Sequence, residues 1–120
     1  MYTNKVILIT GASSGLGRNL AINYAKHGAK IINLSRNKNK MKLVNDELNI
    51  INNKINHYYS VDVSKYNEIK KINNSLKEQN IYPDIIINNA AGNFLCPFNK
   101  LTENGWKRII DIVLNGSFNI

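Results

Sequence analysis

Thr10-Gly11-Ala12-Ser13-Ser14-Gly15-Leu16-Gly17 is the stretch that decides the fold of this chain. It follows an apolar run at residues 6–9 and precedes apolar residues that recur at helical spacing. A glycine-rich turn between a strand and a helix is the context in which such a loop binds phosphate. The alternative, a turn that binds nothing, is disfavoured by the strand and the helix on either side.

Every part of this loop suits a pyrophosphate group. Glycine has no Cβ, so the turn can be tight and the backbone can approach the anion closely. The helix that begins here offers unpaired N–H groups and the positive end of its dipole, and the two serines add hydroxyl donors. The predicted dinucleotide-binding residues of the loop are Gly11, Ser13, Ser14, Gly15, Leu16 and Gly17.

Strand and helix patterns alternate along the rest of the chain. Residues 29–35, 58–61 and 85–87 read as further strands, and helical spacing recurs over 41–51, 69–76 and 102–113. The uninterrupted apolar run at 85–87 predicts a parallel strand that is covered on both faces. We therefore expect an α/β fold, a Rossmann-type doubly wound parallel sheet with strand order 3-2-1-4. Residues 1–120 would be the N-terminal part of a single such domain, truncated after the fourth strand and fourth helix.

Composition narrows the class of protein. No apolar run reaches the roughly 18 residues that a membrane span needs, and the first strand begins too early for a cleaved secretion signal. The single cysteine, Cys96, excludes an internal disulfide and fits a reducing compartment. We expect a cytoplasmic protein without a membrane partner. His27 and His57 have no evident partners and are interpreted as surface residues, and no metal site is expected.

The net charge is +8, from 16 Lys and Arg against 8 Asp and Glu. Such a balance can indicate nucleic acid, a membrane surface or an anionic small molecule as partner. The lysines, however, are scattered among asparagines and lack interleaved aromatic residues, so the charge indicates a solvated surface. We expect no nucleic-acid partner, although a nucleic-acid binder stays as a distant alternative.

The end of the second predicted strand bears on the choice of cofactor. An acidic residue there would accept hydrogen bonds from the adenosine ribose hydroxyls and select NAD. This chain has Ser35 at that place, followed by Arg36. A guanidinium can pair bidentately with a 2′-phosphate, whereas a carboxylate would repel it. The expected cofactor is therefore NADPH; the alternative is an exposed surface arginine.

The spacing Thr-Gly-x-x-x-Gly-x-Gly after a first strand resembles the short-chain dehydrogenase/reductase family. In that family an Asp-aliphatic pair contacts the adenine, and Asp62-Val63 matches it, although Asp62 could also cap the following helix. The run Asn88-Asn89-Ala90-Ala91-Gly92 resembles the family's Asn-Asn-Ala-Gly motif with one extra alanine. The resemblance implies further cofactor contacts at Asn89, Ala90, Ala91 and Gly92.

Part of the chain resembles a narrower group, the NADPH-dependent 2,4-dienoyl-CoA reductases of unsaturated fatty-acid β-oxidation, a branch of lipid metabolism. The residues that carry this resemblance are 88–97, 101–102, 106–107 and 111–116. The resemblance implies hydride transfer to a conjugated acyl-CoA substrate, a homodimer or homotetramer, and the peroxisomal matrix as an alternative location. Asn115 matches a catalytic asparagine, and Phe94 matches a residue that lines the acyl pocket. A helix asparagine and a core phenylalanine are the alternative interpretations.

One departure limits what this chain can do alone. The family's proton donor and cofactor-binding lysine lie beyond a fifth strand that is not present here. Tyr66 and Lys70 have the matching spacing but lie at the adenine end of the sheet, which indicates coincidence. We expect residues 1–120 to be catalytically incomplete. Another short-chain reductase, or a nucleotide-binding remnant without turnover, stays as an alternative.

Overall fold

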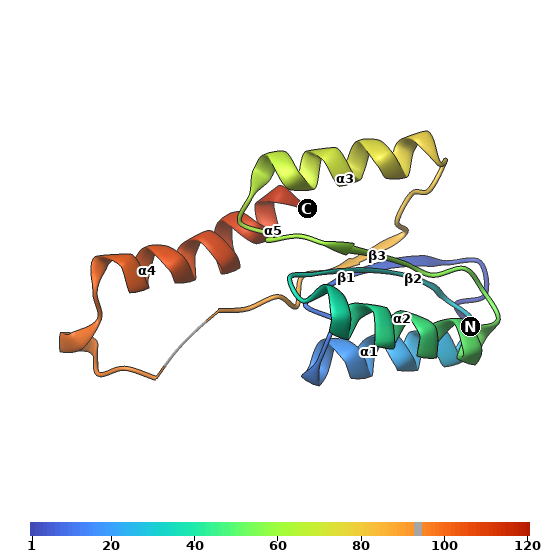
Figure 1. The fold of residues 1–120 in the computed structure, drawn as a ribbon, viewed down its shortest axis with the longest axis horizontal. Coiled ribbons are helices and arrows are strands. Elements are labelled where there is room, and N and C mark those ends of the chain that lie inside the picture. The colour runs from blue at the N-terminus through green and yellow to red at the C-terminus, as the bar shows by residue number, and fades with distance from the viewer. Residues whose placement is uncertain (93–94) are drawn as a thin grey trace.

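The computed structural model describes residues 1–92 and 95–120 (Figure 1). One sheet is formed by four strands: β1 (Val6–Thr10), β2 (Lys30–Ser35), β3 (His57–Ser60) and β4 (Ile85–Ile87). The strands lie in the order β3-β2-β1-β4, and every neighbouring pair is parallel. The predicted fold class and strand order are thereby confirmed.

Helices cover both faces of this sheet (Figure 1). One face carries α1 (Gly15–Lys26) and α2 (Lys38–Asn52), and the other carries α3 (Tyr66–Glu78) and the short α5 (Gly116–Asn119). Side chains alternate across the strands, so the core has two halves. Ile7 and Ile31 pack toward α1 and α2, whereas Leu8 and Ile32 pack toward α3. The carboxyl ends of the strands are left free for a site.

Individual residues near each end determine where the helices begin and end. Gly28 adopts φ +89° immediately after α1, in the left-handed region that glycine enters without strain. The side chain of Asn37 accepts a hydrogen bond from Lys40 N at 3.0 Å and so caps α2. The expected cap at Thr102 is confirmed, because its Oγ1 accepts a hydrogen bond from Gly105 N at 3.0 Å. That cap begins α4 (Glu103–Ile110).

The helix expected over residues 102–113 is observed as α4 followed by a π-helical turn, which leads into α5. A short 3-10 turn, η1 (Phe98–Lys100), precedes α4, and a π-helical turn, η2 (Asp111–Asn115), joins α4 to α5. The Gly116 N–H donates to the carbonyl of Asp111, five residues back, and Ser117 Oγ donates to the carbonyl of Val113 at 2.7 Å. A hydroxyl bonded to a helix carbonyl competes with the regular backbone pattern and accompanies bends.

The expectation that the fourth strand is covered on both faces is wrong for this chain. Ile86, at the centre of β4, is 49% exposed, and in the described ranges β4 pairs only with β1. Ile86 pairs with Leu8 and lies on the face that α3 packs against, and the described helices leave that face half uncovered at this edge of the sheet. His57 is also corrected, because it lies half-buried in β3 and not on the surface.

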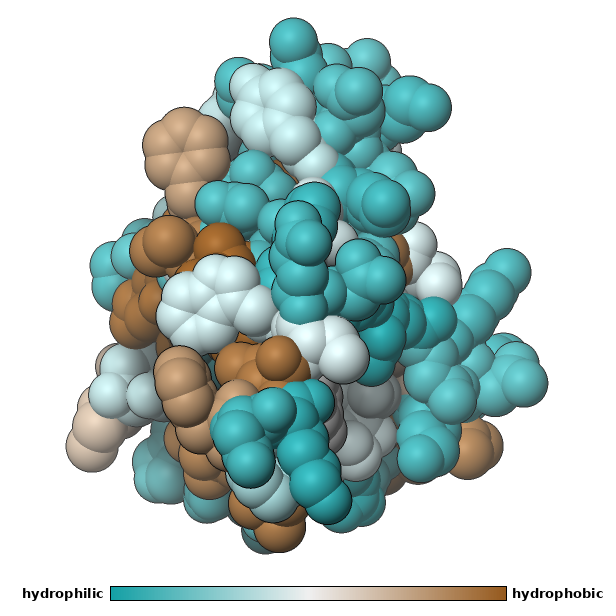
Figure 2. All heavy atoms as spheres, turned by 90° about the vertical axis from the view of Figure 1, so that its left-hand side faces the viewer, coloured by the Kyte–Doolittle hydropathy of each residue, from teal (hydrophilic) through white to brown (hydrophobic). Residues whose placement is uncertain are grey.

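The end of the molecule formed by η1 and α4 is rich in exposed apolar side chains. Phe98 is 89% and Trp106 is 55% exposed, and both line a shallow groove with Leu101. Figure 2 faces this end and shows apolar side chains gathered on one part of it, beside a polar remainder. Because α4 extends away from the sheet, the molecule is 50 Å long but only 28 × 26 Å across.

Candidate functional site

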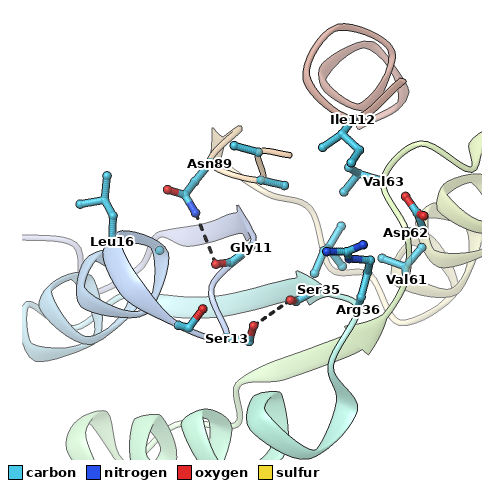
Figure 3. A pocket seen from close by; sticks show the side chains of 15 residues that line it. Gly11, Ser13, Leu16, Ser35, Arg36, Val61, Asp62, Val63, Asn89 and Ile112 are labelled. Carbon is cyan, nitrogen blue, oxygen red and sulfur yellow. Dashed lines mark hydrogen bonds between the residues drawn. The ribbon is translucent and has the colours of Figure 1, made fainter. Parts of the chain in front are cut away.

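A cleft of about 320 Å³ opens at the carboxyl ends of the strands (Figure 3). Its walls come from the glycine loop after β1, the ends of β2 and β3, the loop after β4, and one residue of the π-helical turn. The lining residues are Gly11, Ser13, Ser14, Leu16, Gly17, Leu34, Ser35, Arg36, Val61, Asp62, Val63, Asn89, Ala90, Ala91 and Ile112. Every cofactor residue predicted from the sequence is among them except Gly15 and Gly92.

The three glycines of the loop differ in what they contribute. Gly11 and Gly15 have φ angles of +71° and +54°, a backbone region that strains other residues. A Cβ on Gly17 would lie 2.4 Å from Asn89 Nδ2 and 2.5 Å from the Gly11 carbonyl oxygen. A Cβ on Gly15 would meet nothing within 4 Å. Gly17 therefore lets α1 pack against the neighbouring loops, while Gly15 permits the turn itself.

Thr10 joins two walls of the cleft, a role that the sequence did not reveal. Its side chain is buried, and its Oγ1 accepts hydrogen bonds from Asn89 N at 3.0 Å and Ala90 N at 2.8 Å. In return, Asn89 Nδ2 donates to the Thr10 carbonyl at 3.0 Å. The loop after β4 is thus held beside the glycine loop. A threonine at the end of an apolar strand was the only signal in the sequence.

Two hydroxyls meet where an acidic residue would stand in an NAD site. Ser13 Oγ and Ser35 Oγ lie 2.9 Å apart, and either one can donate to the other (Figure 3). A hydroxyl has one proton, so the serine that accepts this bond keeps its own O–H for another partner. The pair presents a donor to the cleft without adding a negative charge.

Two side chains of opposite charge lie at the ends of β2 and β3. Figure 3 shows Arg36 and Asp62 on the same side of the cleft. Arg36 is exposed, and its backbone carbonyl accepts a hydrogen bond from Ser60 Oγ at 3.0 Å, which ties the two strand ends together. Among the described residues that line the cleft, these two are the charged ones.

Asp62 is held on both of its carboxylate oxygens. Its Oδ1 accepts hydrogen bonds from Ser64 N at 3.0 Å and Ser64 Oγ at 2.6 Å, and its Oδ2 accepts one from Arg108 Nη2 at 3.2 Å. Burial alone would raise the pKa of this carboxyl, but the bonds from Ser64 and the Arg108 guanidinium hold the pKa below its ordinary value. The alternative that Asp62 caps the next helix is wrong, because α3 begins at Tyr66 and its N-cap is Lys65.

The predicted catalytic residue, Asn115, lies outside the lining of the cleft. Asn115 is exposed on the π-helical turn, and its Nδ2 donates to Asp111 Oδ1 at 3.0 Å. Asp111 Oδ2 in turn accepts from Lys107 Nζ at 2.6 Å. Asn115 does not line the cleft, and neither do Tyr66 and Lys70. Phe94 lies outside the described residues.

Gly92 has a packing role at this end of the cleft. A Cβ on Gly92 would lie 2.5 Å from Ile112 Cδ1. The missing side chain therefore makes room for Ile112, which reaches the cleft from the π-helical turn (Figure 3). Ile112 belongs to the run 111–116 that carries the family resemblance, but the sequence did not predict that it lines the cleft.

These residues fit a dinucleotide. The glycine loop leaves open space at Gly15, and the first turn of α1 holds no acidic residue that would oppose an anion. The cationic Arg36 and the serine pair can accommodate a second anionic group at the end of β2. Within residues 1–92 and 95–120, no helix has the length and apolar character to cross a membrane. No three potential metal ligands of the His, Cys, Asp and Glu types cluster in those ranges.

The chain is similar in sequence and fold to known oxidoreductases. The family model described as short chain dehydrogenase matches residues 5–120. The "Probable 2,4-dienoyl-CoA reductase [(2E)-enoyl-CoA-producing]" of Bacillus subtilis is 36% identical over 114 residues, covering 95% of this chain and 44% of that protein. A solved short chain dehydrogenase from Bacillus anthracis is 39% identical with a TM-score of 0.84, covering 96% of this chain and 47% of the other.

A second solved structure, an alcohol dehydrogenase from Thermococcus sibiricus complexed with 5-hydroxy-NADP, is 25% identical with a TM-score of 0.90. It is matched over 96% of this chain and 49% of its own length. In each of these pairwise comparisons the chain spans less than half of the other protein. The likeness therefore concerns one part of these proteins.

Proposed function

Since the chain belongs to the short-chain dehydrogenase family, we propose that residues 1–120 form the N-terminal, cofactor-binding part of a single-domain NADP(H)-dependent reductase. One observation carries the cofactor choice: a serine pair and an exposed guanidinium stand at the end of β2 in place of a carboxylate. The similar Thermococcus sibiricus structure, a complex with 5-hydroxy-NADP, supports the same choice.

Each wall of the cleft would hold one part of the cofactor. The glycine loop and the start of α1 would bind the pyrophosphate, and Arg36 would pair with the 2′-phosphate. Asp62 and Val63 would contact the adenine, and the backbone at Asn89 to Gly92 would border the nicotinamide ribose. The bound cofactor would supply a hydride to the substrate.

For the substrate, we propose a 2,4-dienoyl-CoA thioester. The Bacillus subtilis relative carries that name, and the family model matches residues 5–120, which include Asn115. The exposed amide of Asn115, held by Asp111, would help to organise the reacting groups. The proton would come from a donor outside residues 1–120, because Tyr66 and Lys70 lie on α3, away from the cleft.

The test is a pair of titrations of the full-length protein, with NADPH and with NADH. Arg36→Asp should weaken NADPH binding by ~2–3 kcal/mol, because it removes a charge-assisted contact and adds repulsion. Binding of NADH, which has no 2′-phosphate, should change far less. Lys38→Asp is the matched control, since Lys38 is also exposed but does not line the cleft.

An unchanged ratio of NADPH to NADH affinity in the Arg36 variant would remove Arg36 from the site. The substrate is tested separately by following NADPH absorbance with a 2,4-dienoyl-CoA. If the rate of NADPH oxidation is the same with and without the dienoyl thioester, this substrate class is rejected. The cofactor assignment would stay intact.

A further inference from the structure

Arg108 approaches the cleft from outside its lining. It lies on α4, and its Nη2 is 3.2 Å from Asp62 Oδ2, across a sequence separation of 46 residues. The Asp62 side chain is 20% exposed and the Arg108 side chain 44% exposed, so the pair is partly shielded from water. This ion pair joins the helical segment 103–119, which is made of α4, η2 and α5, to the loop that follows β3.

Two further contacts fasten the same segment to the same loop. Asn119 Nδ2 donates to the carbonyl of Val63 at 2.8 Å. A Cβ on Gly116 would lie 2.8 Å from Val63 Cγ2, so only glycine permits this close approach. The residue that follows Asp62 is therefore anchored, and Arg108 is placed by contacts beyond its own ion pair.

The Asp62–Arg108 ion pair changes the net charge at this end of the cleft. An unpaired Asp62 would oppose Arg36 and would repel an anionic nucleotide. With Arg108 beside Asp62, the three groups sum to one positive charge. A carboxylate has about four acceptor positions, and the structure fills two on Oδ1 and one on Oδ2. Among residues 1–92 and 95–120 no donor takes the second position on Oδ2, which a ligand donor could use.

We infer that Arg108 is a positioning residue for the adenosine end of the cleft. It fixes the Asp62 carboxylate in one orientation and offsets its charge toward a nucleotide that carries a 2′-phosphate. This inference rests on the proposed function, because it assumes that the cleft binds such a nucleotide. It adds a residue from a helix outside the cleft to the groups that set affinity for the phosphorylated cofactor.

The experiment uses the full-length protein and two probes, adenosine 2′,5′-bisphosphate and adenosine 5′-monophosphate. Arg108→Gln should weaken binding of the bisphosphate by about tenfold, the scale of one charge-assisted hydrogen bond. The monophosphate should lose less, because it carries less charge to be repelled. A site that was merely loosened would lose affinity for both probes to the same extent.

Three variants complete the design. Arg108→Lys keeps the charge and should recover most of the bisphosphate affinity. In an Asp62→Asn background, Arg108→Gln should change affinity by less than about twofold, since no carboxylate remains to be offset. Lys42→Gln is the control: its exposed ion pair with Asp46 is of similar length, 3.1 Å, and lies on α2. Urea unfolding of each variant shows whether the fold is retained.

The outcomes separate the two proposals. If the unmodified protein binds neither NADPH nor the bisphosphate, the proposed cofactor fails, and this inference fails with it. If the unmodified protein binds and folded Arg108→Gln binds equally well, only the role of Arg108 is overturned. An equal loss in the Asp62→Asn background would also overturn it, because Arg108 would then act without Asp62.

Discussion

Thr10 and Ala90 are 80 positions apart in the chain, yet the Thr10 hydroxyl oxygen accepts a hydrogen bond from the Ala90 N–H at 2.8 Å. The same oxygen accepts from the preceding N–H, that of Asn89, at 3.0 Å. Buried N–H groups without a partner destabilise a fold strongly. A single hydroxyl therefore satisfies the backbone at the point where two walls of the cleft meet.

Replacing Thr10 by valine should destabilise the protein. The change keeps the shape of the side chain but removes the acceptor of two backbone N–H groups. We expect a loss of about 2–4 kcal/mol in the free energy of unfolding, from two unsatisfied donors. Thr10→Ser keeps the oxygen and loses one methyl, about 1 kcal/mol. Urea denaturation checks both variants, and equal losses would show that the hydroxyl has no such role.

The glycines of the loop should respond differently to alanine. In Gly17→Ala the new Cβ would collide with Asn89 Nδ2 and the Gly11 backbone, at 2.4 and 2.5 Å. Overpacking against backbone should cost about 3 kcal/mol and separate the loops. At Gly15 the space is open, so Gly15→Ala should cost only about 1 kcal/mol, from its positive φ.

Thermal unfolding of the two glycine variants side by side is the measurement. Gly15→Asn provides a control, because asparagine tolerates the left-handed region better than alanine does. If Gly15→Ala proved the more destabilising variant, the close packing at Gly17 would be refuted.

His57 should make the stability depend on pH. Burial, followed by the charge of Lys30, lowers the pKa of its imidazole below the ordinary value of 6.5. The folded state thus prefers neutral His57, while the unfolded chain takes up a proton near pH 6.5. This contribution to stability is present above that pH and is lost as the pH falls through it.

The check is urea unfolding at about pH 7.5 and about pH 5.5, on either side of that ordinary value. His57→Gln should reduce the difference between the two conditions. His27→Gln is the matched control, because His27 is exposed at the end of α1. A difference that is unchanged by His57→Gln would assign the dependence to other groups. The carboxyls of Asp62, Asp84 and Asp111 have lowered pKa values and act only in more acidic solution.

Much of the fold could be predicted from the sequence because its signals are local. The glycine loop, the apolar strands and the caps at Gly28 and Thr102 are each read from a few neighbouring residues. The strand order followed from the doubly wound sheet that alternating strands and helices predict after such a loop. For the same reason, the sequence predicted those residues of the cleft lining that belong to a motif at the end of a strand.

The remaining features depend on contacts between distant parts of the chain. The partners of Thr10 are fixed by the register of β1 against β4, and Arg108 reaches Asp62 across 46 positions. Neither pairing leaves a pattern in the sequence. The π-helical turn at Asp111–Asn115 was missed because one bond that reaches back five residues barely disturbs helical spacing.

The exposed edge at β4 leads to the last prediction, for residues 1–120 expressed on their own. The strand is apolar throughout, and in the described ranges its outer side has no partner strand. Such an edge is a template for pairing with another chain. We expect this piece to self-associate at about micromolar concentrations or above, to bind NADPH weakly if at all, and to turn over no dienoyl thioester.

Light scattering of the purified piece, with and without Ile86→Lys, tests the edge directly. A lysine on the edge strand should oppose strand pairing and reduce association. Ile50→Lys adds the same charge on α2, at a side chain that is 84% exposed, and should leave association unchanged. An equal reduction by both variants would assign the effect to net charge, and monomeric unmodified protein would refute the open edge.

Turnover approaching about 1–10 per second would mean that this piece contains its own proton donor, and Tyr66 would be the first residue to replace.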